Sequence, residues 1–243
     1  NYEAAQDFKS GTVTGRAGHE LSRDEVGSTA YDTRNHTLGL ALKSGNHLIE
    51  AKVGFQDMPY QLYPNQRMDL LDNTQHRLNL RYLGHFNWGT VEARAYHEVV
   101  DHFMDFGADK RFWYGSLSGA GAAGSPCAPI RFMGDPIGTC AGGMPMSTES
   151  KTSGATLKAS IVLSQQDMLH VGGELQRYRL NDWWPASGGG MGPGTFWNVN
   201  NGQRDRTALF GEWEKQFDVR WATSLGARFA RVATAAGAAR GCT

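Results

Sequence analysis

Side chains that bind soft metals gather in one stretch of the sequence, residues 102–152. This stretch contains four of the eight methionines and two of the three cysteines, together with a histidine. The residues concerned are His102, Met104, Cys127, Met133, Cys140, Met144 and Met146. Thioether and thiolate sulfur are soft donors, which Cu(I) prefers and which Mg²⁺, Ca²⁺ and Mn²⁺ do not. The stretch is therefore a candidate copper-binding segment. The alternative is that its methionines only fill irregular gaps in the packing.

Met144 and Met146 are the leading candidates in this stretch because they flank Pro145. Proline fixes φ and favours an extended local backbone. In an extended segment residues two apart point the same way, so both sulfur atoms can reach one metal ion. The weaker candidates in the same stretch are Met133, Met104 and His102.

The two cysteines of the stretch have two competing interpretations. Cys127 and Cys140 are separated by 12 residues, and a disulfide that closes a loop of this size contributes about 3 kcal/mol in the loop-entropy model. The competing interpretation is a pair of free thiols bound to copper. Export into an oxidising compartment would favour the disulfide. The third cysteine, Cys242, has no assigned role.

The elements that position these side chains are predicted to be β-strands. Apolar and polar residues alternate along most of the chain, which places successive side chains on opposite faces of a strand. For example, Ile49, Ala51 and Val53 alternate with Glu50 and Lys52. Strands are predicted at residues 10–20, 34–43, 47–57, 74–83, 89–101, 153–164, 169–181, 205–216 and 221–232. No segment shows convincing helical spacing.

The connections between the predicted strands alternate strictly between short and long. The short joints are residues 44–46, 84–88, 165–168 and 217–220, and the long ones are 21–33, 58–73, 102–152 and 182–204. All long connections therefore fall at one end of the sheet, a rule that a soluble β-sandwich has no reason to keep. Strands of about 10–13 residues also exceed the ~5–6 typical of soluble sheets and suit a tilted crossing of a bilayer.

The two faces of the predicted sheet differ in the way expected of a membrane barrel. The polar face carries Lys, Arg and Glu along whole strands, which suits a wet lumen, and the apolar face would then meet lipid. Aromatic residues cluster near both ends of the strands, as interfacial girdles do. They are Phe86, Trp88, Phe217 and Trp221 beside the short joints, and Phe55, Tyr60, Tyr63, Tyr178, Trp183 and Trp184 near the long ones. The sequence therefore predicts an all-β fold, a partial antiparallel transmembrane β-barrel of about nine strands.

Composition argues against several other classes of protein. The 24 basic residues balance the 24 acidic ones, and the pI is near 7.2, whereas domains that bind nucleic acid are usually basic. No apolar run approaches the ~18 residues of a membrane helix. We find no nucleotide-binding glycine loop, nucleophile elbow or zinc-protease helix, so no enzyme is predicted. The mean hydropathy of −0.47 agrees with strands in which only alternate residues face lipid.

Six segments together resemble TonB-dependent outer-membrane receptors, and most closely the copper receptor family among them. They are residues 83–96 (LGHFNWGTVEARAY), 102–107 (HFMDFG), 143–149 (GMPMSTE), 171–185 (VGGELQRYRLNDWWP), 192–198 (GPGTFWN) and 206–213 (RTALFGEW). Each segment alone is a weak signal, whereas the composite is specific. The resemblance extends over most of the chain from about residue 35 onward.

This resemblance implies a place in the cell outer membrane, in contact with its lipid, and a barrel of about 22 strands filled by a plug domain. The plug would contact the TonB complex, and copper would be the transported ion. Residues 1–232 are then expected to be part of the barrel domain, and residues 233–243 an atypical tail. The plug and the TonB box are expected elsewhere in a longer protein. Met144 and Met146 would form only part of a copper site whose other ligands come from the plug.

Two alternatives to a copper receptor remain open at this point. A siderophore or haem receptor would bind a bulky ligand through aromatic and arginine contacts and would be indifferent to Met144 and Met146. An adhesin or autotransporter-type barrel would use its long connections to bind a partner and would need neither metal nor plug.

Overall fold

The structure, a computed structural model, describes residues 2–5, 8–14, 20–26, 31–63, 68–105, 145–186 and 195–238. Every helix or strand assigned within these residues is a β-strand. The strands are β1 (Tyr2–Ala5), β2 (Phe8–Thr14), β3 (Glu20–Val26), β4 (Tyr31–Ser44), β5 (His47–Gln61), β6 (Asp69–Phe86), β7 (Gly89–Asp105), β8 (Met146–Val162), β9 (Asp167–Trp184), β10 (Phe196–Gln216) and β11 (Ala222–Ala235). In the described part of the chain there is no helix long and apolar enough to cross a membrane.

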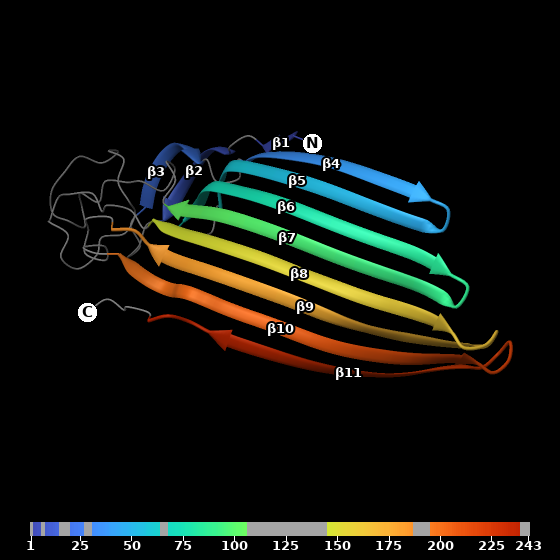
Figure 1. Ribbon diagram of the computed structural model, residues 1–243. Helices are drawn as coiled ribbons and strands as arrows, with labels where there is room; N and C mark the ends of the chain where they lie inside the picture. The colour runs from blue at the N-terminus through green and yellow to red at the C-terminus, as the bar shows by residue number, and fades with distance from the viewer. Residues whose placement is uncertain are drawn as a thin grey trace.

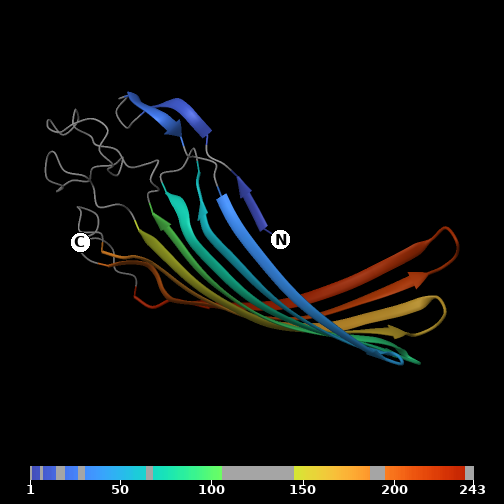
Figure 2. The same cartoon turned by 90° about the horizontal axis from the view of Figure 1, so that it is seen from above.

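Nine strands form a single antiparallel sheet in the order β1-β4-β5-β6-β7-β8-β9-β10-β11 (Figure 1). From β4 onward each strand pairs with the next strand along the chain, so the sheet is an up-and-down meander. The remaining two strands, β2 and β3, pair with each other in a separate small sheet. The large sheet is strongly curved (Figure 2). It is the wall of a partial β-barrel, which confirms the predicted all-β fold.

The convex face of the sheet is apolar and uncovered. Leu40, Leu80, Leu157 and Leu175 are 60%, 44%, 56% and 56% exposed, and the register aligns such residues across neighbouring strands. Among the described residues whose burial is known, the only buried hydrophobic side chains are Leu70 and Ala208. Within the described ranges, therefore, nothing forms a second layer over the apolar face of the large sheet. Its leucines form an exposed apolar patch, a feature that marks an interaction surface with protein or membrane.

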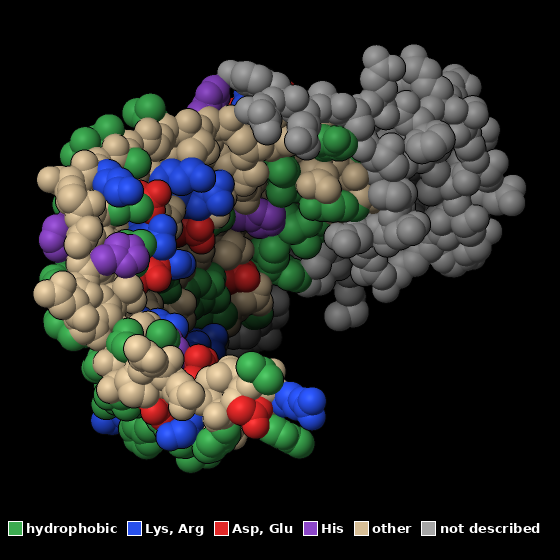
Figure 3. Space-filling view, turned by 90° about the vertical axis from the view of Figure 1, so that its right-hand side faces the viewer, with side chains coloured by type: hydrophobic (Ala, Val, Ile, Leu, Met, Phe, Trp, Pro, Cys, Tyr) green, Lys and Arg blue, Asp and Glu red, His purple; other side chains and the backbone are tan. Residues whose placement is uncertain are grey.

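The concave face carries the charged residues. Seen from the end with the short turns, Lys, Arg, Asp and Glu side chains gather in the hollow of the sheet (Figure 3). The Arg81 guanidinium on β6 contacts the strands on both sides, Glu50 of β5 at 2.9 Å and Glu92 of β7 at 3.0 Å. Farther along the sheet, Glu174 accepts from Arg228 and lies 3.7 Å from Arg206. These three arginines are thus matched by carboxylates on nearby strands.

Tight turns close one end of the sheet, as predicted. Gly45 begins the two-residue turn between β4 and β5 and has a φ of 54°, a conformation that glycine adopts without strain. At the β10–β11 turn the Asp218 carboxylate accepts from the backbone N–H groups of Arg220 and Trp221, at 2.6 and 2.9 Å. Short polar side chains stabilise turns in this way. Phe86 and Trp88 stack beside another of these turns, with ring centroids 5.3 Å apart.

The predicted strand ends were wrong at the other end of the sheet. Strands β4 to β11 have 14 to 21 residues, not 10–13. The strand predicted at 89–101 runs on to Asp105, and the one predicted from 153 begins at Met146. Likewise, parts of 58–73 and 182–204 that were predicted as loop are strand. Apolar alternation marks only the part of a strand that faces an apolar medium, whereas backbone pairing continues beyond it.

The predicted first strand was also placed wrongly. Residues 10–20 straddle β2 and the first residue of β3, which belong to the separate two-stranded sheet, and most of β3 lies in the predicted loop 21–33. The sheet instead gains its ninth strand from β1, whose Tyr2 and Ala5 pair with Arg34 and Tyr31 of β4. Four residues are too few for alternation to reveal a strand.

Candidate metal site

The long connection between β7 and β8 leaves from and returns to neighbouring strands, and three of the predicted ligands lie at these two strand ends. Met104 is the last residue but one of β7, and Met146 is the first residue of β8. They are register partners, and the Cβ atoms of directly opposed residues are about 4.5–5.5 Å apart. His102 lies two residues before Met104 and therefore shares its face. The three residues were predicted to lie in a loop, but paired strands fix their positions.

The face that these residues share is the concave one. His102 and Met104 are separated from Glu92 and Arg94 by even numbers of residues along the regularly paired strand β7, so they lie on the same side. All three candidate ligands are half-buried. The site therefore lies on the inner wall of the curved sheet, at the end opposite the short turns.

The protonation of His102 is set by its neighbour on β6. Its Nδ1 lies 3.0 Å from Oδ1 of Asn73. Because an amide oxygen can only accept, Nδ1 must carry the proton and donate it. In the neutral ring Nε2 then retains a lone pair, which is the arrangement that a metal-binding histidine needs.

Burial favours the neutral form of this histidine. His102 lies beyond the apolar part of β7, and burial lowers its pKa below the ordinary histidine value, an effect that the charge of Asp182 partly opposes. Asn73, His102, Thr148 and Asp182 are successive register partners across β6, β7, β8 and β9. Nδ2 of Asn198 on β10 donates to Oδ1 of Asp182 at 2.9 Å. Polar side chains from five strands thus lie in one row beside the methionine pair.

Buried and packed side chains lie next to this row. Leu70, the register partner of Met104 on its other side, is 4% exposed. The adjacent Asp69 is fully buried, and its Oδ1 accepts from the backbone N–H of Tyr63 at 2.7 Å, which fixes the connection between β5 and β6. The ring centroids of Trp184 and Phe196 are 5.7 Å apart at the ends of β9 and β10.

The structure brings together part of the predicted ligand set. Met104, Met146 and His102 lie on one face, so two candidates ranked as weaker join one of the two leading candidates. The others, Met144, Met133, Cys127 and Cys140, lie outside the described residues. The part of the chain that the structure describes contains no group of three His, Cys, Asp or Glu side chains suited to a metal ion. A site here therefore depends on methionine sulfur.

Sequence reasoning missed the two residues that support His102, Asn73 and Asp182. Asn73 lies 29 residues before His102 in the sequence, and neither residue belongs to a local motif. Only the register of the sheet brings them beside the histidine. Knowledge of the strand pairing was therefore the missing signal.

The donors have a definite chemical character. A neutral imidazole nitrogen and two thioether sulfur atoms carry no formal charge and are borderline to soft ligands. Such a set suits copper, and Cu(I) in particular, far better than Mg²⁺ or Ca²⁺, which prefer oxygen.

Comparison with known proteins supports the fold. No protein-family model matches the chain, and no curated protein sequence matches it. Among solved structures, the chain is similar to the copper transporter OprC, with a TM-score of 0.69 and 18% sequence identity. The match covers 96% of this chain and 32% of that one, so this chain spans about a third of the length of OprC. At this identity the similarity establishes the fold alone.

Proposed function

We propose that this chain forms part of the barrel wall of an outer-membrane transport receptor of the TonB-dependent type. An apolar convex face and a charged hollow are the arrangement of a barrel that has lipid outside and water inside. The fold similarity to OprC supports the same class of protein. In this proposal residues 1–232 belong to the barrel domain and residues 233–243 form a tail, although β11 continues to Ala235 and so takes the first three residues of that tail into the sheet. The remaining strands and the plug come from other parts of a longer protein.

The transported ion in this proposal is copper. The observation that carries it is the Met104–Met146 pair with His102 beside it on the concave face, where an imported ion would pass. OprC is described as a copper transporter, which supports the same cargo. Met144 and Met133 belong to the connection that joins the two strands. We propose them as further copper contacts.

The proposed receptor has two further features that follow from its class. TonB coupling would act through the plug, which supplies the remaining copper ligands. Cys127 and Cys140 would form a disulfide in the connection between β7 and β8, since an exported segment meets oxidising conditions.

Copper binding to the full-length protein tests the cargo. Met104→Leu combined with Met146→Leu preserves side-chain volume and removes both sulfur atoms, so we expect Cu(I) affinity to fall at least about tenfold. Met168→Leu is the matched control, because Met168 lies near the short-turn end of β9. Isothermal titration against a competing chelator measures both constants. Equal Cu(I) affinity in the double variant and the wild type would overturn the ligand assignment.

Transport and location are tested separately. Cells that carry the wild-type gene should accumulate copper faster than cells that carry the double methionine variant, and the protein should be recovered with the outer-membrane fraction. Uptake of an organic iron chelate with no response to copper would support the siderophore alternative instead. Recovery in the soluble fraction would contradict the whole proposal.

A further inference from the structure

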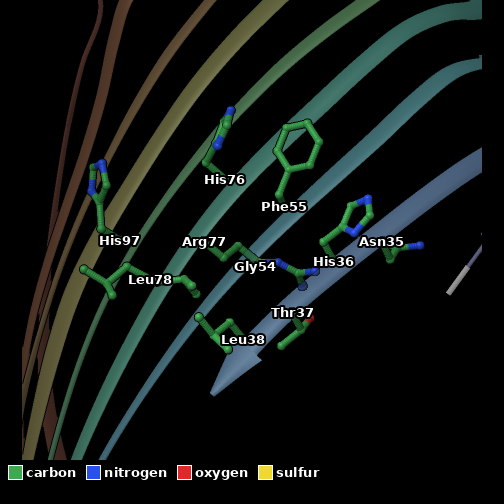
Figure 4. Close-up of a pocket in the computed structure, with 11 residues that line it drawn as sticks. Asn35, His36, Thr37, Leu38, Gly54, Phe55, His76, Arg77, Leu78 and His97 are labelled. Atoms are coloured by element: carbon green, nitrogen blue, oxygen red, sulfur yellow. The ribbon is translucent and has the colours of Figure 1, made fainter. Parts of the chain in front are cut away.

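Basic and imidazole side chains lie where the apolar convex face ends. Figure 4 shows the rings of His36, Phe55 and His76 on three neighbouring strands, with His97 beside Leu78. The register gives His36, Phe55 and His76 as successive partners, and Leu78 as the partner of His97. The Phe55 ring centroid lies 5.0 Å from that of His76 and 6.3 Å from that of His36.

The same register rows continue onto β8 and β9 with fixed positive charges. His76 is partnered by Val99, and Val99 by Lys151, which faces Arg179. His97 is partnered by Ser153, which faces Arg177. We call this set the cationic rim: His36, His76, His97, Lys151, Arg177 and Arg179. The rim follows the boundary of the apolar face from β4 to β9, with its six residues on five of these strands.

The positive charges of the rim are incompletely matched by the protein. Lys151 and Arg179 are direct register partners, and like charges opposed in this way are destabilising. Asp205 accepts from Arg179, with contacts of 2.5 and 3.3 Å, and is also the register partner of Arg177, so one carboxylate faces two guanidinium groups. In the described part of the chain Lys151 and Arg177 form no salt bridge, and both are exposed.

The concave face provides the contrast. There the guanidinium of Arg81 is held between Glu50 and Glu92, and Arg94 is also paired with Glu92. Apart from Asp205, which lies in the rim row itself, the carboxylates nearest Lys151 on this face, Asp101 and Glu149, lie one row farther from the apolar face. An anion would therefore fit between the leucine rows and this acidic row.

We infer that the cationic rim binds the phosphate headgroup of an anionic membrane lipid whose acyl chains lie against the apolar convex face. Lys151, Arg177 and Arg179 face a single carboxylate in the rim, Asp205, and Lys151 and Arg177 form no salt bridge with a described residue, so these two supply the charge for the anion. The imidazole N–H groups and the Phe55 ring flank the headgroup at the level where apolar and polar side chains meet. The inference rests on the membrane location proposed above, but it does not depend on copper.

Two lipids that differ only in the phosphate provide the probe. Dioleoyl phosphatidic acid and dioleoylglycerol have the same acyl chains, and their binding to the full-length protein is measured in neutral detergent micelles. We expect the wild-type protein to bind phosphatidic acid in preference. Lys151→Gln combined with Arg177→Gln should weaken that binding about thirtyfold, since each basic residue at an anionic surface contributes about fivefold.

Arg204→Gln is the matched control, because Arg204 lies beside Asp205 on β10 but on the concave face. It should change the dissociation constant for phosphatidic acid less than about twofold. Equal binding of the two lipids by the wild type, or equal binding of phosphatidic acid by the double variant, would overturn the inference. Complete displacement of the lipid by an equal concentration of inorganic phosphate would also overturn it, since the site would then take free phosphate. Failure of lipid binding in a protein that is still recovered with the outer-membrane fraction would contradict this inference alone. Recovery of the protein in the soluble fraction would contradict the proposed function.

Discussion

The two ends of the sheet are built by different means. At the short-turn end the chain reverses within a few residues, and local contacts such as those of Asp218 with Arg220 and Trp221 define each turn. At the other end the strands continue past the apolar face, and residues far apart in sequence meet. There His102 contacts Asn73, and Met104 faces Met146. Local sequence thus determines the short-turn end, whereas strand register determines the end that carries the candidate site.

The largest expected effect comes from a charge placed in the apolar middle of the sheet. Leu157→Arg should destabilise the protein folded in lipid vesicles by about 2–4 kcal/mol, the cost of an arginine near the middle of a bilayer. Ser153→Arg lies on the same strand and face but at the rim, where the cost falls to about 0–1 kcal/mol. Urea titration in vesicles measures both free energies of unfolding. Equal destabilisation by the two substitutions would mean that the convex face does not span a bilayer.

A smaller effect is expected at the short-turn end. Gly89 has a φ of 146°, and an added Cβ would lie 1.9 Å from the carbonyl oxygen of Ser160. Gly89→Ala should therefore cost about 1–3 kcal/mol in the free energy of unfolding. Gly45→Ala is the matched comparison, since Gly45 has a positive φ but no atom within 4 Å of an added Cβ. Gly45→Ala should cost only about 1 kcal/mol. A larger cost for Gly45→Ala than for Gly89→Ala would show that the close approach of the Ser160 carbonyl is not the reason why position 89 requires glycine.

The site end should respond to pH through His102. Protons compete with copper for Nε2, so affinity falls only as pH drops through the pKa of this histidine. Because burial lowers that pKa, Cu(I) affinity should remain constant from neutral pH to about 6.5, the ordinary histidine value, and fall only below it. Affinity measurements across this range test the prediction. The His102→Gln variant should lose this pH-dependent step, and a step in the wild type above pH 6.5 would contradict the assigned burial.

The smallest effect is expected on the concave face between the two ends. Arg81→Gln removes contacts to Glu50 and Glu92, but exposed ion pairs contribute little to stability. We expect a shift in the urea midpoint smaller than that of any substitution above, and a weaker one still at high salt. A large shift that is independent of salt would show that these pairs are shielded from solvent.

The same contrast explains what could be predicted from sequence. Alternation of residues such as Ile49 and Glu50 identified eight of the nine strands of the large sheet, and the turn at Gly45 was placed correctly. Alternation fades beyond the apolar face, so the last residue of β7 was predicted too early and the first residue of β8 too late. The candidate site was predicted as a set of residues, not as an arrangement. Pairing of Met104 with Met146 requires the register, which no local pattern encodes.

The central claim is that Met104 and Met146 bind copper together on the concave face. X-ray absorption spectroscopy of the Cu(I)-loaded full-length protein counts the sulfur atoms around the metal directly. We predict that Met104→Leu and Met146→Leu each remove one sulfur from the copper coordination shell, whereas Met168→Leu removes none. A sulfur shell that is the same in the wild type and in both variants would contradict it.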